Sequence, residues 1–139
     1  MDVFELGEIV KLLDMSPVKA KNWTIGRPFK LDASIKTASG QGSRNLYSLE
    51  DVYLMGVANE MSHAGMAAKA IGKLVAALRS KFPEGLSGVD RLYLTRGEKL
   101  SYRIETRQDR IPANTVVALV VDLSTLRNRI EERLRRSRK

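Results

Sequence analysis

The stretch LGEIVKLLDMSPVKAKNW, residues Leu6–Trp23, decides how the first half of this 139-residue chain folds. Apolar residues recur at helical spacing over Leu6–Leu13, which predicts a first short helix. Asp14 is a common turn residue, and Ser16-Pro17 combines a favourable N-cap with a favourable first-turn residue. A second helix is therefore predicted from Pro17 to about Thr24, joined to the first by a tight turn.

The following segment, residues 29–47, loses this helical pattern. Leu31 and Ile35 on one side, and Leu46 and Tyr47 on the other, flank the Gly- and Ser-rich sequence KTASGQGS, which is typical of a hairpin tip. Two short helices, a tight turn and a hairpin together make a winged helix-turn-helix. In that motif the second helix can enter the major groove of DNA.

Two longer helices are predicted next. Ser48 and Asp51 have the spacing of a capping box, so a third helix is predicted over Leu49–Ser62. Gly65 ends that run, and a fourth helix is predicted over Met66–Lys81. The methionines of these helices are expected to fill the core rather than to bind a metal.

The last third of the chain alternates strands and turns before a final helix. Three strands are predicted, at Arg91–Thr95, Ser101–Arg107 and Thr115–Leu123. The sequence TVVALVV in the third strand is apolar throughout, so this strand is expected to be central or covered on both faces. Ser124 is expected to cap a C-terminal amphipathic helix. The predicted fold class is α+β: a winged helix-turn-helix of residues 1–82, then residues 87–139 with a small antiparallel β element and the C-terminal helix.

The C-terminal helix carries a narrow apolar stripe beside an arginine-rich face. It can pack back on its own sheet, or it can pair with its copy in a second chain. The stripe is too short for an independent coiled coil, so a homodimer would use the sheet and the helix together. The predicted dimerisation residues are Val117, Leu119, Leu126, Ile130 and Leu134.

Composition excludes several classes of site. The chain has no cysteine, and its only histidine, His63, cannot build a zinc site alone. No Gly-rich phosphate loop or paired acidic motif occurs, so we expect neither an enzyme nor a bound cofactor or metal. The chain has no run of about 18 apolar residues and does not begin like a signal peptide. A cytoplasmic protein without membrane contact is therefore expected.

The charge of the chain favours a polyanionic partner. The net charge is +8, and between Pro17 and Leu46 there are six basic residues and one acidic residue. This one-sided charge is what neutralisation of DNA phosphates requires, although a solvated cationic surface without a partner would look similar. Tyr47 can either contact DNA or pack against the third helix. The predicted DNA-contacting residues are Ser16, Lys19, Lys21, Asn22, Arg27, Lys30, Lys36, Arg44 and Tyr47.

These segments resemble the MerR-type winged helix-turn-helix family. Gly7-Glu8-Ile9-Val10, Ser16-Pro17 and Trp23 match the opening two helices of the family, and GSRNLYSLEDVYLM (Gly42–Met55) is similar to its wing and next helix. The likeness covers about residues 4–80, and the C-terminal strands and helix lie outside it. The resemblance implies a dimeric DNA-binding transcription regulator. It also implies that Lys19 and Lys21 lie on the recognition helix, and Arg44 and Tyr47 on the wing.

The leading prediction is a nucleoid-associated, sequence-specific regulator that binds double-stranded DNA as a homodimer, at an operator with paired half-sites. One alternative is an architectural or excisionase-like accessory protein that uses the same winged domain. The other is a protein-interaction module built on a winged-helix scaffold. The operator sequence, activation or repression, and any small-molecule effector are left open.

Overall fold

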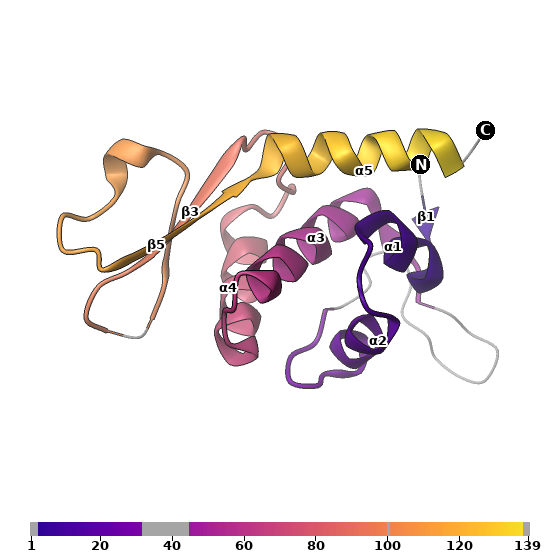
Figure 1. The fold of residues 1–139 in the computed structure, drawn as a ribbon, viewed down its shortest axis with the longest axis horizontal. Helices are drawn as coiled ribbons and strands as arrows, with labels where there is room; N and C mark the ends of the chain where they lie inside the picture. The colour runs from indigo at the N-terminus through magenta and orange to yellow at the C-terminus, as the bar shows by residue number, and fades with distance from the viewer. Residues whose placement is uncertain (1–2, 32–44, 100, 138–139) are drawn as a thin grey trace.

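The computed structural model describes residues 3–31, 45–99 and 101–137, and its class is mixed α+β (Figure 1). The described residues form five α-helices and two small antiparallel sheets. In chain order the elements are β1 (Val3–Phe4), α1 (Leu6–Leu13), α2 (Pro17–Ile25), β2 (Tyr47–Ser48), α3 (Leu49–His63), α4 (Ala68–Lys81), β3 (Arg91–Arg96), β4 (Arg103–Glu105), the 3-10 helix η1 (Gln108–Arg110), β5 (Val117–Asp122) and α5 (Leu123–Ser137).

The local signals of the sequence are confirmed for the first four helices. α1 has the predicted bounds, and the backbone N–H of Lys19 donates to Ser16 Oγ (3.3 Å), so Ser16 does cap α2. The capping box of Ser48 and Asp51 is present at the start of α3. Gly65 follows α3 with a φ of +88°, a left-handed conformation that glycine adopts without strain. α4 begins at Ala68, two residues later than predicted.

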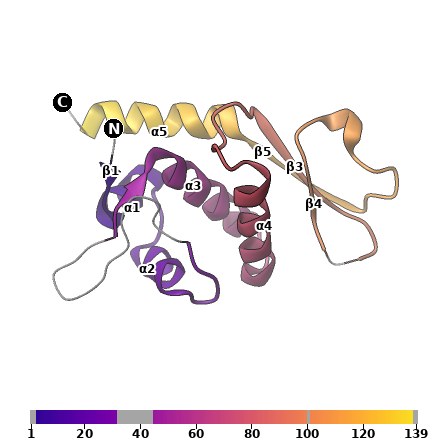
Figure 2. The ribbon, with the colours of Figure 1, turned by 180° about the vertical axis from the view of Figure 1, so that it is seen from behind.

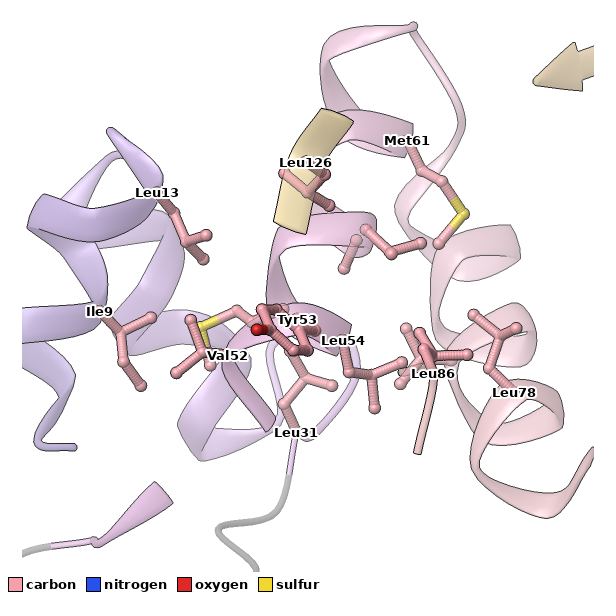
Figure 3. Close-up of a cluster of buried hydrophobic side chains, with 14 of the residues drawn as sticks. Ile9, Leu13, Leu31, Val52, Tyr53, Leu54, Met61, Leu78, Leu86 and Leu126 are labelled. Carbon is pink, nitrogen blue, oxygen red and sulfur yellow. The ribbon is translucent and has the colours of Figure 1, made fainter. Parts of the chain in front are cut away.

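α3 is the central helix, and every residue from Asp51 to Asn59 is buried. A helix buried all round needs neighbours on each side, and α1, α4 and α5 supply them. Gly56 allows two of these helices to approach closely. A Cβ atom there would lie 3.2 Å from Leu13 of α1 and 3.3 Å from Leu126 of α5. Figure 3 shows apolar side chains from these helices gathered around α3.

The first sheet joins the beginning of the chain to the segment before α3. Phe4 pairs with Tyr47 and Val3 with Ser48, in an antiparallel register. The predicted hairpin falls mostly on residues 32–44, which lie outside the described residues, as do the predicted site residues Lys36 and Arg44. The structure therefore shows the two short helices and a two-residue strand pair. The winged arrangement itself remains a prediction.

The second sheet has the strand order β4-β3-β5, with both pairings antiparallel. The prediction that Thr115–Leu123 is central or covered on both faces is wrong, because β3 pairs on both sides, β5 forms one edge of the described sheet, and one face of β5 is exposed. Leu92 and Leu94 of β3 are fully buried, whereas Val116 and Val120 at the β5 edge are 67% and 53% exposed. An uninterrupted apolar run cannot distinguish a buried strand from an edge strand with one apolar face in solvent.

α5 runs across the helical half of the molecule, beside α3 and α1 (Figures 1 and 2). It neither folds back flat on the sheet nor stands apart for a second chain. Its N-cap is Asp122, whose Oδ1 accepts from the N–H of Thr125 at 3.0 Å, and not Ser124 as predicted. Ser124 is inside the first turn, and its hydroxyl donates to Asp90 Oδ1 at 3.1 Å.

The apolar stripe of α5 is used within one chain. Leu126 is 7% exposed, Ile130 is fully buried and Leu134 is partly buried against the same core. Leu126 and Ile130 therefore cannot serve as dimerisation residues while α5 keeps this position, which corrects the prediction for both. Arg133 adds a hydrogen bond from Nη1 to the carbonyl oxygen of Leu12 at 2.8 Å. One hydrophobic cluster thus contains residues of both predicted regions, 1–82 and 87–139.

Candidate nucleic-acid interface

α1 and α2 are joined by a tight turn of three residues, Asp14–Ser16. Asp14 adopts the left-handed conformation, with a φ of 49°, which Asp tolerates better than most residues. α2 buries Ala20 and Trp23 against the rest of the protein and turns Val18 and Lys21 outward. The helix thus presents one short exposed face that carries both apolar and basic side chains.

Lys19 lies on the inward side of that helix. Its Nζ donates to Asn59 Oδ1 at 3.1 Å and to Ser62 Oγ at 3.0 Å, both on α3, and lies 5.4 Å from the centre of the Trp23 ring. This differs from the prediction of a DNA contact, because the ammonium group is occupied by hydrogen bonds within the chain. Lys19 instead fixes the position of α2 on α3, which makes it a positioning residue.

Tyr47 is also an internal residue. Its side chain is 1% exposed, and its hydroxyl oxygen accepts a hydrogen bond from Asn45 Nδ2 at 3.4 Å. Its partner in the first sheet is Phe4, which is fully buried. Of the two predicted roles, packing is therefore the one that the structure supports, and the predicted phosphate contact by Tyr47 is corrected.

Three of the predicted cations lie on the surface: Lys21, Arg27 and Lys30. Arg27 and Lys30 belong to residues 26–31, which we call the α2 loop. This loop folds back on α2, because the N–H of Arg27 donates to the carbonyl oxygen of Asn22 (2.8 Å) and the N–H of Leu31 to that of Trp23 (2.8 Å). The loop therefore holds its two cations close to the end of α2. Ser16 is exposed but used as the helix cap, and Asn22 is partly buried.

Sequence reasoning missed two further cations, Lys69 and Lys73 of α4. Both are exposed and lie one helical turn apart, so they share a face. Between them is Gly72, where an added Cβ would lie 2.7 Å from the Cβ of Phe29 in the α2 loop. Phe29 in turn packs on Trp23, with ring centres 5.0 Å apart. The signal in the sequence was a Lys pair at i,i+4 in a helix without acidic residues.

The result is a basic surface on three adjacent segments, consisting of Lys21, Arg27, Lys30, Lys69 and Lys73. No acidic residue occurs in Met15–Leu31 or in α4. α2 and one end of α4 lie on the side of the molecule away from α5 (Figures 1 and 2). A surface that gathers exposed side chains of one charge attracts a polyanion such as a nucleic acid.

Metal sites and membrane-spanning helices are the other features of interest in the part of the chain that the structure describes. No group of three or more His, Cys, Asp or Glu side chains is placed to hold a metal ion there. Among the same residues, none of the helices combines the length and apolar character needed to cross a bilayer. No family model and no curated protein matches the chain.

Proposed function

We propose that this chain is a sequence-specific regulator that binds double-stranded DNA through the basic surface of α2, the α2 loop and α4, and acts as a homodimer. The observation that carries the proposal is the convergence of five exposed cations on three adjacent segments that contain no acidic residue. Phosphate contacts from Lys and Arg supply most of the affinity of such proteins for DNA. The resemblance over residues 4–80 to MerR-type regulators supports the same reading.

The exposed face of α2 has the size and chemistry for base contacts. A helix of nine residues is about 13 Å long, and the major groove is about 12 Å wide. Lys21 would donate to a guanine edge or a phosphate. Val18, which is 69% exposed on the same helix, would contact a thymine methyl group. Arg27, Lys30, Lys69 and Lys73 would bind the phosphates on either side and set the register of the helix.

A homodimer would read two related half-sites, because two-fold symmetry in the protein requires it in the operator. Selection of bound DNA from a random pool tests this directly, since it reports binding, half-site symmetry and half-site spacing together. Promoter-centred occupancy in the genome supports a regulator. Occupancy of one attachment or replication locus would instead support an architectural or excisionase-like role for the same surface.

The salt dependence of binding tests the basic surface residue by residue. Each lost phosphate contact should lower the slope of log K against log salt by about 0.9, so a symmetric dimer of Arg27→Ala should lose about two. Arg110→Ala is the matched control, because Arg110 is exposed in η1 and the change of charge is the same. Salt-independent binding, or equal losses for Arg27→Ala and Arg110→Ala, would overturn the proposal.

A further inference from the structure

The outer edge of β5 is the most unusual surface of the second sheet. β5 pairs with β3 on one side, and within the described residues no strand lies along its other side. Thr115–Val121 contains seven residues without a charged side chain. Edge strands of monomeric proteins are normally protected by charges, prolines or bulges, because their open N–H and C=O groups attract another strand. Apart from Asp122 at its end, the described strand β5 shows none of these protections.

The exposed face of this edge is apolar, with Val116, Ala118 and Val120 in solvent. Leu119 and Val121 border a groove of about 400 Å³ between the end of α3 and the start of α5, which Glu60 and Arg129 also line. A strand added along β5 would lie in the plane of the sheet and set its own side chains beside the three exposed apolar residues.

We infer that the occupant of this edge is β5 of a second copy, in an antiparallel pair whose two-fold axis passes beside Ala118. The inference rests on the homodimeric part of the proposed function and names its surface. A β5 edge is self-complementary under such an axis, because residues directly opposite lie on the same sheet face. Val116 of each chain then meets Val120 of the other, and Ala118 meets Ala118 of the second copy.

The uncharged stretch of the strand favours this register. With Ala118 on the axis, the seven uncharged residues Thr115–Val121 of each chain lie opposite the same seven residues of the other. An axis one residue nearer the C-terminus would place Asp122 opposite Val116. The Asp122 carboxylate already accepts from the N–H of Thr125 and pairs with Arg91, and desolvating it beside an apolar side chain is unfavourable. The neutral strand also brings no like charges together, although the chain has a net charge of +8.

The size of the contact predicts a weak dimer. A strand of six residues is about 20 Å long, so the pairing falls in the small class of specific interfaces, below about 1,200 Å² of total buried surface. We expect a dissociation constant in the micromolar range. The sheet lies at the end of the molecule away from α1, and the basic surface shares no residue with β5 (Figures 1 and 2). Pairing therefore leaves both DNA-contacting surfaces open.

A single introduced cysteine tests the axis, because the natural chain has none. Opposite Cα atoms in an antiparallel pair are about 4.5–5.5 Å apart, within the range of about 4.4–6.8 Å that a disulfide spans. Ala118→Cys should form a covalent dimer under mild oxidation at least ten times faster than Ala77→Cys, an exposed alanine of α4 changed in the same way. Equal rates, or wild-type protein that stays monomeric at high micromolar concentration, would overturn the inference.

Two double variants test the register. Both change the same two residues, so their effects on folding should be similar. Val116→Lys with Val120→Lys creates two pairs of facing lysines in the dimer. Sedimentation should therefore show a monomer at every protein concentration. Val116→Lys with Val120→Glu creates two opposite-charge pairs instead and should dimerise within about ten-fold of wild type. If both variants dimerise like wild type, β5 is not the interface. If neither does, the Ala118 register is wrong. These measurements use no DNA. A negative result would therefore not contradict DNA binding by the basic surface, and a failure to bind DNA would not contradict pairing through β5.

Discussion

Truncation of Ile130 to alanine measures how firmly α5 is held by its own chain. Ile130 is fully buried, and its Cδ1 lies 3.6 Å from the position that a Cβ of Gly56 would occupy in α3. The change removes three carbon atoms, worth about 0.8 kcal/mol each when transferred from water to the core. The cavity left behind adds to this, so we expect a loss of about 3 kcal/mol. Domains of this size are stable by only about 5–15 kcal/mol, so the loss is large.

Urea unfolding followed by circular dichroism at several protein concentrations is the appropriate assay. With a slope of about 2 kcal/mol per molar urea, the midpoint should fall by roughly 1–2 M while the slope stays constant. The loss should be the same at every protein concentration, because the contacts of Ile130 are intramolecular. Leu134→Ala is the matched control one turn later on α5. It should lose less than half as much, since Leu134 is only partly buried.

Two results would refute the reasoning. A loss below about 1 kcal/mol would mean that truncating Ile130 exposes little apolar surface, so that its contacts contribute little to the stability of the fold. A loss that grows as the protein is diluted would mean that Ile130 lies between subunits, as the sequence predicted. In that case α5 would detach from α3 and pair with a second chain.

Three further predictions follow from single residues. Lys19→Met removes two hydrogen bonds to α3, so the melting temperature should fall by an amount equivalent to about 1–3 kcal/mol and the fluorescence of the single tryptophan should change. An unchanged melting temperature and spectrum would contradict its positioning role. Gly72→Ala drives a Cβ into Phe29, so it should weaken both stability and DNA affinity, whereas Gly7→Ala, with no neighbour within 4 Å, should stabilise α1 by about 0.5–1 kcal/mol. Similar effects of the two changes would contradict the contact. Burial, with the charge and hydrogen bond of a nearby glutamate, raises the pKa of Tyr53 from 10.0 to about 12.

The direction of the pH effect on stability follows from the difference between the pKa of Tyr53 in the folded and in the unfolded chain. The raised pKa means that the unfolded chain loses the Tyr53 proton near pH 10 while the folded chain keeps it to about pH 12. The stability that Tyr53 contributes is therefore complete below pH 10 and lost as the pH rises to about 12. In Tyr53→Phe this loss is absent, so the stability advantage of wild type should shrink over that interval. A constant difference between the two proteins from pH 9 to 12 would contradict the shifted pKa.

Local features of this protein were predictable from the sequence. The ends of α1, α2 and α3 depend on residues within one helical turn, such as Ser16 with its hydrogen bond to the N–H of Lys19 and Ser48 with Asp51. The three C-terminal strands were also located, although β3 is one residue longer than predicted and β4 and β5 are shorter at both ends. Ser124 was misplaced as the cap of α5 because Asp122, two residues earlier, is equally suited to that role.

Side-chain direction was less predictable than the elements themselves. Lys19 and Tyr47 have the residue types of DNA contacts, yet both point inward, because α3 supplies acceptors for one and Phe4 a β-sheet partner for the other. Conversely, Lys69 and Lys73 joined the basic surface only because Gly72 allows Phe29 to pack closely against α4. These contacts connect residues 40 or more positions apart, and no local pattern in the sequence records them.

Caps, periodicity and charge are local properties, so the amino-acid sequence is enough to locate most helices and strands and to show that the segment after α1 is strongly basic. Only the tertiary structure decided that β3 is the central strand, that α5 lies across α3 and α1, and which cations share one surface. The physical reason is the same in each case. Apolar surface is buried against whichever partner the whole chain brings near, and glycines such as Gly56 determine how close that partner can come.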